Sequence, residues 1–253
     1  MQIYAGSLTR SMWISKALAS FLTLFALWWV LLIIFNRFPE LDLAAARSVF
    51  SQRDCGVLDA ISKTCGAFQL DKNPFFMAAR TVFLALPYIA IAILLGLIVM
   101  SRRRLGKDWK TPEVKMSLAA LVSLAMGCGV LVNLILKSFS GRPRPRNTLL
   151  FGGNLDFVQA GSFAGKCLKN CSFISGEASS AGWLFCLILL LPARWRLPVG
   201  LPLAVISISI PTLRVLTGAH YLSDAVLGWL SSLVIFAGVL VVAETMRQPR
   251  EVA

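Results

Sequence analysis

Histidine, tyrosine and acidic residues are scarce in this chain. Its 253 residues include one histidine, three tyrosines and 12 Asp plus Glu, and charged residues of both signs make up only 15%. A single histidine excludes any metal site built from three histidines, and any histidine pair. So little charge, beside 57% apolar residues, also excludes an ordinary water-soluble domain, in which roughly a quarter of the residues are charged.

Long apolar runs dominate instead. A helix that spans a bilayer needs about 20 consecutive apolar residues, and six stretches approach or reach that length with almost no charge. They are 17–35, 80–100, 116–136, 178–193, 198–213 and 225–243. The pattern predicts an all-α bundle of six transmembrane spans, a single membrane domain over residues 1–253. The first run is longer than a signal-peptide core and lacks a small-residue cleavage site after it, so we expect it to be retained.

Positive charge exceeds negative charge by 13. Nucleic acid, anionic lipid headgroups and a phosphorylated substrate would all attract such a chain. Nucleic acid is disfavoured because the basic residues are scattered through short loops, with no soluble domain to present them. The expected partners are therefore the bilayer and a phosphorylated lipid.

The loops also predict an orientation. With six spans both termini share one side, and that side has the denser basic residues, above all Arg102-Arg103-Arg104. The positive-inside rule then places the termini in the cytoplasm.

Four of the six cysteines lie in loops on the other side of the membrane. They are Cys55 with Cys65 in one loop, and Cys167 with Cys171 in another. We expect two local disulfides, which persist only in oxidising compartments. Free thiols or a metal site are the alternative, although the spacings do not form a paired zinc pattern. Disulfides here would place this face outside the cytoplasm.

Three polar clusters border the apolar spans. They are Lys137 with Arg142, Arg144 and Arg146, then Ser175-Gly176-Glu177, then Arg214 with His220 and Asp224. They occupy the end of the third span, the start of the fourth and the junction of the last two, so six-span threading brings all three to one face. Ionisable residues at such positions are costly unless they are paired or functional.

The only histidine has a carboxylate four residues after it. If residues 218–226 begin a helix, His220 and Asp224 share one helix face. Asp224 would then accept a hydrogen bond from Nδ1 and leave Nε2 free as a base or nucleophile. The alternative is a structural pair that holds the start of the helix. Arg214 lies only six residues before His220, so its guanidinium and the imidazole can reach one ligand.

The basic cluster suits an anionic ligand. Arg142, Arg144 and Arg146, with Lys137, would form a phosphate clamp that stabilises charge in a transition state. The alternative is a belt that binds lipid headgroups, which is the expected role of Arg142 and Arg146 if they do not join the clamp. Backbone N–H groups at Ser175-Gly176, before an apolar helix, would add an anion site, although such a pair is also an ordinary helix cap.

Glu177 would repel a phosphate if it were ionised and unpaired. It is therefore either neutralised by an arginine or protonated through burial, and the protonated form could act as a general acid. The alternative is a first-turn carboxylate stabilised by the helix dipole.

These residues together resemble the type 2 phosphatidic acid phosphatase superfamily, whose pattern is Lys-x6-Arg-Pro, then Pro-Ser-Gly-His, then Ser-Arg-x5-His-x3-Asp. Lys137 and Arg144-Pro145 match the first part. Ser175-Gly176 match the middle of the second part, and Arg214, His220 and Asp224 match the third. Ile174 and Leu213 replace the usual Pro and Ser, which are changes of backbone support. Glu177 replaces the family's second histidine, which protonates the leaving group.

The resemblance implies hydrolysis of a phosphate ester without a metal or other cofactor, through a phosphohistidine. His220 would be the nucleophile and Asp224 its orienting partner. Lys137, Arg144 and Arg214 would clamp the phosphate, helped by Ser175 and the Gly176 backbone. Glu177 would be the general acid. The chain is similar to bacterial lipid A phosphatases, which implies a multi-pass protein of the bacterial inner membrane with its site facing the periplasm. A lipid A 1- or 4′-phosphate is the expected substrate.

Several alternatives stay open. The same motifs serve phosphatidylglycerophosphate and undecaprenyl pyrophosphate phosphatases, and the same intermediate permits transfer of the phosphate to another lipid. Because of Glu177, an inactive lipid-binding protein is a further alternative. A transporter or anion channel is disfavoured, because its charges should lie at mid-membrane depth.

Overall fold

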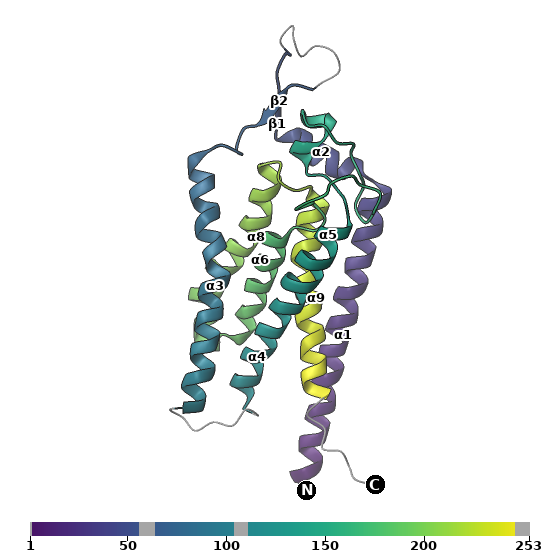
Figure 1. The fold of residues 1–253 in the computed structure, drawn as a ribbon. Coiled ribbons are helices and arrows are strands. Elements are labelled where there is room, and N and C mark those ends of the chain that lie inside the picture. Colours follow the sequence, from purple (N-terminus) through teal and green to yellow (C-terminus); the bar gives the residue numbers. More distant parts are fainter. Residues whose placement is uncertain (1, 56–63, 104–110, 246–253) are drawn as a thin grey trace.

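The computed structural model is a bundle of long helices with a small lobe at one end (Figure 1). It describes residues 2–55, 64–103 and 111–245, with side chains from residue 15 onward. Arg104, the last residue of the basic block, lies outside the described residues.

The helices follow the apolar runs of the sequence. The long ones are α1 (Gln2–Arg37), α3 (Pro74–Arg103), α4 (Pro112–Leu124), α8 (Leu201–Leu216) and α9 (Leu222–Thr245). The shorter ones are α2 (Glu40–Ser48), α5 (Lys137–Phe139), α6 (Gly176–Cys186) and α7 (Ala193–Trp195). The π-helical segments Ala125–Leu136 and Arg196–Gly200 join α4 to α5 and α7 to α8, and α6 ends in a 3-10 turn, Leu187–Leu190.

Five of these helical stretches are long and apolar enough to cross a membrane. They are Ser15–Arg37, Pro74–Arg103, Pro112–Phe139, Ala193–Leu216 and Leu222–Thr245. The run expected as a fourth span forms only the shorter apolar helix Gly176–Leu190. At about 1.5 Å per residue this helix rises about 22 Å, less than the roughly 30 Å of a hydrocarbon core. The described chain therefore has five full-length candidate spans and one short helix where six spans were expected.

Helix α9 is the centre of the bundle and packs against α1, α4, α6 and α8. Its contact with α6 is close because Gly182 faces the backbone of Trp229, where a Cβ would collide with the carbonyl oxygen. Small residues let helices approach in this way in membrane bundles. Polar groups between the two helices are paired, with 2.8 Å between the hydroxyl oxygens of Ser179 and Ser232. Fully buried Trp183 and Leu227 fill the core beside them.

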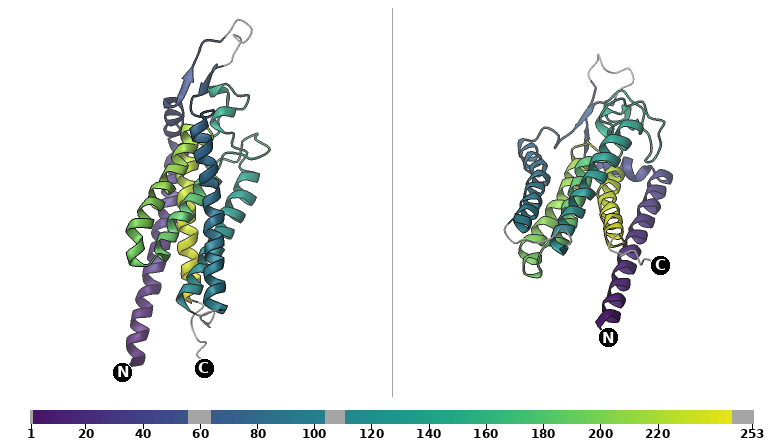
Figure 2. Two further views of the ribbon diagram at one scale, coloured as in Figure 1. Left: turned by 90° about the vertical axis from the view of Figure 1, so that its left-hand side faces the viewer. Right: turned by 60° about the horizontal axis from the view of Figure 1, so that its bottom comes forward.

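The lobe beyond the bundle combines α2, a hairpin and a long irregular segment (Figure 2). Strands β1 (Phe50–Gln52) and β2 (Gly66–Phe68) pair antiparallel, with Phe50 opposite Phe68. Cys55 and Cys65 form a disulfide next to this hairpin. The rings of Phe50 and Phe68 pack with Phe151. Residues 146–173 are irregular apart from 3-10 turns. The hairpin in the loop 36–79 was not predicted.

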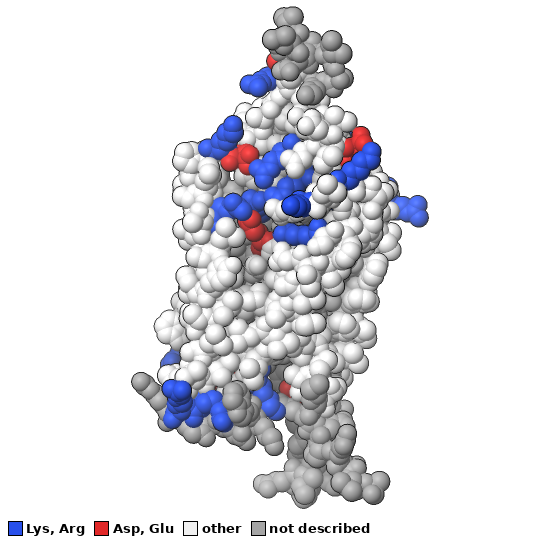
Figure 3. Space-filling view, viewed as in Figure 1, with Lys and Arg blue, Asp and Glu red and all other residues white. Residues whose placement is uncertain are grey.

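The described charged side chains that are visible on one face of the bundle lie near its two ends. On the face shown in Figure 3, Lys, Arg, Asp and Glu gather in a band near the lobe and in a second group at the other end, with an uncharged belt between them. Apolar side chains such as Leu22, Val82 and Leu134 are exposed along the helices. This distribution is the one expected of a protein whose middle section faces lipid.

Candidate active site

The three polar clusters of the sequence meet at the end of the bundle that carries the lobe. Lys137 begins α5, Ser175 precedes α6, Arg214 is in the last turn of α8 and Asp224 is in the first turn of α9. His220 lies in the turn between α8 and α9. Residues from four separate parts of the bundle thus converge on one polar site.

A tight turn keeps His220 close to Arg214. The backbone N–H groups of Ala219 and His220 both donate to the Arg214 carbonyl oxygen, each at 3.1 Å. Gly218 has a φ of +61°, and a Cβ there would collide with the ring of Phe68. Only glycine meets both demands without strain.

The imidazole of His220 is 2% exposed and is held through Ser172. Its Nδ1 lies 2.9 Å from the Ser172 carbonyl oxygen and 3.8 Å from Asp224 Oδ2. The Ser172 hydroxyl donates to Asp224 Oδ2 at 2.5 Å. The nearest acceptor of Nδ1 is therefore a backbone carbonyl, whereas the sequence suggested the Asp224 carboxylate. Asp224 instead accepts a hydrogen bond from the hydroxyl of Ser172. Sequence reasoning missed Ser172.

This environment leaves His220 uncharged at neutral pH. Burial lowers the pKa of His220 to about 4 from its ordinary 6.5, although the Asp224 carboxylate acts in the opposite direction. Because a carbonyl oxygen only accepts, Nδ1 carries the proton and Nε2 keeps a free lone pair. The imidazole of the unfolded chain takes up a second proton below about pH 6.5, whereas that of the folded protein does so only near pH 4. Protonation therefore favours the unfolded chain, and the folded protein loses stability as the pH falls between those values.

The cationic groups lie around this histidine. Arg214 is 5% exposed, and its Nε has no hydrogen-bond partner among the described residues. A Cβ on Gly176 would come within 3.0 Å of Lys137 Nζ, so the start of α6 is in contact with this lysine. Burial, and then the neighbouring charge of Arg146, lower the pKa of Arg144. A bound anion would reduce the repulsion between these cations and accept a hydrogen bond from Arg214 Nε.

Ser175 is buried and serves as the N-cap of α6, because its Oγ accepts a hydrogen bond from the Ala178 N–H at 3.2 Å. Its own N–H donates to the Asp224 carbonyl oxygen at 3.0 Å. This is the helix-cap alternative that the sequence left open. It joins the first turn of α6 to the first turn of α9.

Glu177 is paired with arginine. Arg80 donates to both carboxylate oxygens, from Nη2 at 2.8 Å and from Nε at 3.2 Å, and Arg214 Nε lies 3.4 Å from Glu177 Oε2. Of the two states considered from the sequence, neutralisation by arginine is therefore the one observed. The sequence did not single out Arg80, because it lies within an apolar run that begins another helix.

Arg142 is fully buried behind the site and does not reach a lipid headgroup, which corrects one expectation. Its Nε donates to the Val158 carbonyl oxygen at 2.7 Å, its Nη1 to Asp224 Oδ1 at 2.6 Å and its Nη2 to Asp42 Oδ2 at 2.7 Å. All three nitrogens are thus occupied within the protein. Arg146 is one-third exposed and paired with Asp71 at 2.7 Å, so it stays at the surface of the site.

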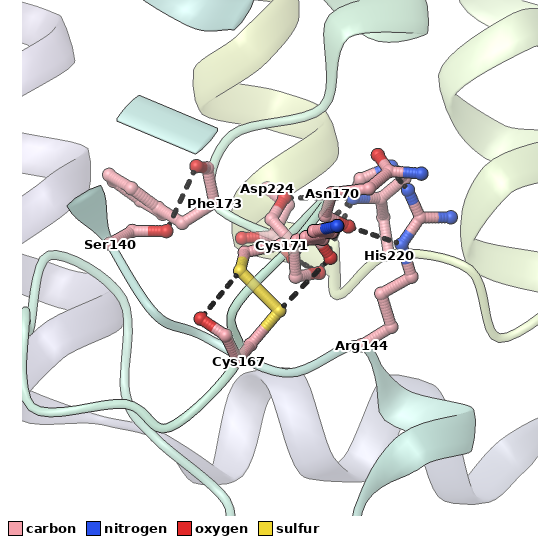
Figure 4. Close-up of a disulfide and its surroundings, with 10 residues drawn as sticks. Ser140, Arg144, Cys167, Asn170, Cys171, Phe173, His220 and Asp224 are labelled. Carbon is pink, nitrogen blue, oxygen red and sulfur yellow. Dashed lines mark hydrogen bonds and ion pairs between the residues drawn. A yellow bond between two sulfur atoms is a disulfide. The ribbon is translucent and has the colours of Figure 1, made fainter. Parts of the chain in front are cut away.

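The Cys167–Cys171 disulfide lies directly beside the site (Figure 4). The loop that it closes contains Asn170, whose backbone and side-chain oxygens accept from Arg144 at 3.2 and 2.7 Å. Ser172 follows the second cysteine. The disulfide loop thus orients both Arg144 and the carbonyl that holds His220. Within the described residues, no three His, Cys, Asp or Glu side chains gather as a metal site.

A groove of about 420 Å³ leads from Glu177 and Asn133 along the membrane-facing part of the bundle. Apolar side chains of α3, α4 and α8, including Phe83, Leu121 and Ile210, line the rest of it. Glu177 therefore borders both the polar site and a space that suits an alkyl chain.

Comparison with known proteins agrees with this arrangement. The model of the PAP2 superfamily matches residues 118–247. The chain is 45% identical to a lipid A 4′-phosphatase of Rhizobium leguminosarum, over 90% of this chain and 97% of the relative. It is 43% identical to a lipid A 4′-phosphatase of Rhizobium etli, over 91% and 90%. The crystal structure of a transmembrane PAP2 type phosphatidylglycerolphosphate phosphatase from Bacillus subtilis shares the fold, with a TM-score of 0.50 and 20% identity over 91% of this chain and 99% of that one.

Proposed function

The chain belongs to the PAP2 superfamily, and from that premise we propose that it is a membrane lipid phosphatase that removes the 4′-phosphate of lipid A through a phosphohistidine. The observation that carries the proposal is the neutral His220, whose Nε2 lone pair is free beside buried cations. Both Rhizobium relatives are named for the lipid A 4′-phosphate.

The reaction has two displacements. In the first, Nε2 of His220 attacks phosphorus, the bond to the lipid oxygen breaks and that oxygen takes up a proton. In the second, water attacks the phosphohistidine, the P–N bond breaks, and inorganic phosphate leaves. Lys137, Arg144 and Arg214 hold the nonbridging oxygens and stabilise their charge in both transition states, which is the main form of catalysis in phosphoryl transfer. Nδ1 stays protonated toward the Ser172 carbonyl oxygen.

Glu177 is proposed to supply the leaving-group proton. In the free protein its carboxylate accepts from Arg80 and neighbours Arg214. A phosphate competes for the same guanidinium groups, so its arrival frees the carboxylate to take up a proton from solvent and donate it to the lipid oxygen. In the second displacement the same carboxylate accepts a proton from the attacking water.

Glu177→Gln tests this role, because glutamine keeps the hydrogen-bonding shape but transfers no proton. We expect kcat to fall by about 10²-fold, as for the loss of a general acid, with a changed pH-rate profile. The exposed Glu40, which is paired with Arg47 at the surface, provides the control variant Glu40→Gln. A Glu177→Gln enzyme with an unchanged profile would show that the residue only anchors Arg80 and Arg214.

The disulfide beside the site yields a second prediction. Replacing Cys167 and Cys171 with serine should lower phosphate release by about tenfold, because Asn170 would hold Arg144 less firmly, and a charge-assisted hydrogen bond is worth about 1.5–3 kcal/mol. The matched control replaces Cys55 and Cys65, which close the hairpin loop. Equal losses in the two double variants would mean that the effect is a general loss of stability.

Several features support a lipid substrate reached from the periplasm. The groove beside Glu177 can receive an acyl chain while the phosphate reaches His220. Both disulfides lie at the end of the molecule that holds the site, which favours an oxidising compartment for that end. The basic residues that end α3 lie at the opposite end, as expected for the cytoplasmic side. With α6 as a short sixth crossing, both termini would be cytoplasmic.

The direct test is phosphate release by the detergent-purified protein with a metal chelator present. The substrates are lipid A with both phosphates, lipid A with only the 1-phosphate, phosphatidylglycerophosphate and undecaprenyl pyrophosphate. We expect release from the first alone, with mass spectrometry showing that the 1-phosphate remains. Release from the second substrate would contradict the 4′ assignment. Release from either of the last two alone would assign a different lipid, and release from none would favour an inactive lipid-binding protein.

A further inference from the structure

A buried charge network behind His220 extends beyond the residues of the proposed mechanism. Arg142 and Asp42 are both 0% exposed, as are Asp224 and Ser223. Asp42 comes from α2, far from the segment 118–247 that matches the family model. Its side chain nevertheless reaches the start of α9.

We propose that Asp42 is a positioning residue for His220. It supplies a second buried carboxylate beside Arg142, so the network behind the histidine carries one net negative charge. The inference rests on the proposed function, in which positive charge develops on the imidazole as Nε2 bonds to phosphorus.

The contacts show how Arg142 is divided between two carboxylates. Its Nη1 donates to Asp224 and its Nη2 to Asp42, at 2.6 and 2.7 Å. The guanidinium carbon lies 4.4 Å from the centroid of the Tyr221 ring, an additional cation–π contact. The side chain is therefore immobilised on both edges and on one face, and it fixes the position of Asp224.

The charge balance gives Asp42 its importance. Asp224 paired with Arg142 alone would present no net charge to His220. With Asp42 on the other side of the same arginine, two carboxylates share one guanidinium, so a negative charge remains. In a buried site, such a charge strongly stabilises a developing imidazolium. Burial raises the pKa of Asp42 and Arg142 opposes that rise.

Asp42 also has a structural contact, which the test must separate from this electrostatic role. Its Oδ1 accepts from the Ser223 backbone N–H at 2.7 Å, and its Oδ2 accepts from the Ser223 hydroxyl at 2.6 Å. A carboxylate in this place stabilises the N-terminus of α9. Loss of stability alone would therefore not establish an effect on His220.

The single histidine permits a direct measurement. In protein labelled with ¹⁵N-histidine and purified without a histidine tag, every imidazole signal comes from His220. For Asp42→Asn we expect kcat to fall 10- to 100-fold with KM within about twofold, and we expect the imidazole ¹⁵N signals to shift. Assays are made below the unfolding midpoint of each variant. Glu40→Gln, on the exposed side of α2, should match the wild type in both readouts.

An Asp42→Asn protein with a lower unfolding midpoint but wild-type kcat and imidazole signals would overturn the inference. If this variant does not fold, Asp42→Glu carries the test, because it keeps the buried negative charge beside Arg142. It should keep its imidazole signals near those of the wild type, and strongly shifted signals would again overturn the proposal. The imidazole signals do not depend on turnover. A failure of the proposed function would appear as full activity in His220→Ala, and it can therefore be distinguished from a failure of the proposed role of Asp42.

Discussion

Replacing His220 with alanine is expected to reduce phosphate release by at least about 10³-fold, the scale of losing a nucleophile. The cationic groups would still bind the lipid, so its affinity should change little. The measurement is the rate of phosphate release from lipid A with both phosphates, alongside binding of the same lipid to the variant.

Because His220 is the only histidine, covalent trapping gives an unambiguous second readout. Wild-type protein quenched during turnover of ³²P-labelled lipid A should carry acid-labile, base-stable label, as phosphohistidine does. His220→Ala should carry none. Label that persists in the variant, or turnover close to the wild-type rate, would show that another residue is the nucleophile.

Replacing Arg142 with alanine is expected to cause the largest loss of stability. The change leaves the buried carboxylates of Asp42 and Asp224 without their shared partner, and removal of one member of a buried ion pair costs about 3–5 kcal/mol. Activity should fall as well, since Asp224 loses its position beside Ser172. Unfolding in detergent, followed by tryptophan fluorescence, measures the change.

Arg146→Ala is the matched control for this variant. Arg146 belongs to the same basic cluster of the sequence, but it is one-third exposed and paired with the equally exposed Asp71. Such pairs are worth about 0–1 kcal/mol, so its unfolding should stay near that of the wild type. Equal destabilisation by the two substitutions would contradict the interior role of Arg142.

The convergence of Lys137, Arg214 and His220 could be predicted because it depends on simple geometry. Apolar spans leave ionisable residues only at their ends, and successive spans alternate direction, so the ends of the third and fifth spans meet at one face. The loop 36–79 contains the short helix α2 as well as a hairpin. The hairpin in the same loop was missed because strands of three residues are too short to show an alternating pattern.

Other site residues carry no recognisable pattern. Ser172 holds His220 through its backbone carbonyl, a group that every residue has. Arg80 lies in the first turns of a helix that is otherwise apolar, and it meets Glu177 only because α3 packs beside α6. Asp42 resembles a first-turn carboxylate of an ordinary surface helix.

The sequence by itself therefore determined the helical membrane class, the superfamily motifs and the face on which they meet. Each of these follows from the length of an apolar run or from a fixed spacing along the chain. Only the tertiary structure decided that the run 178–193 forms a short helix, that Arg142 points inward between Asp42 and Asp224, and that a carbonyl is the nearest acceptor of His220 Nδ1. The physical reason is that these contacts join residues far apart in the sequence. They form only when the irregular segment before α6 takes its folded path, and that path depends on packing.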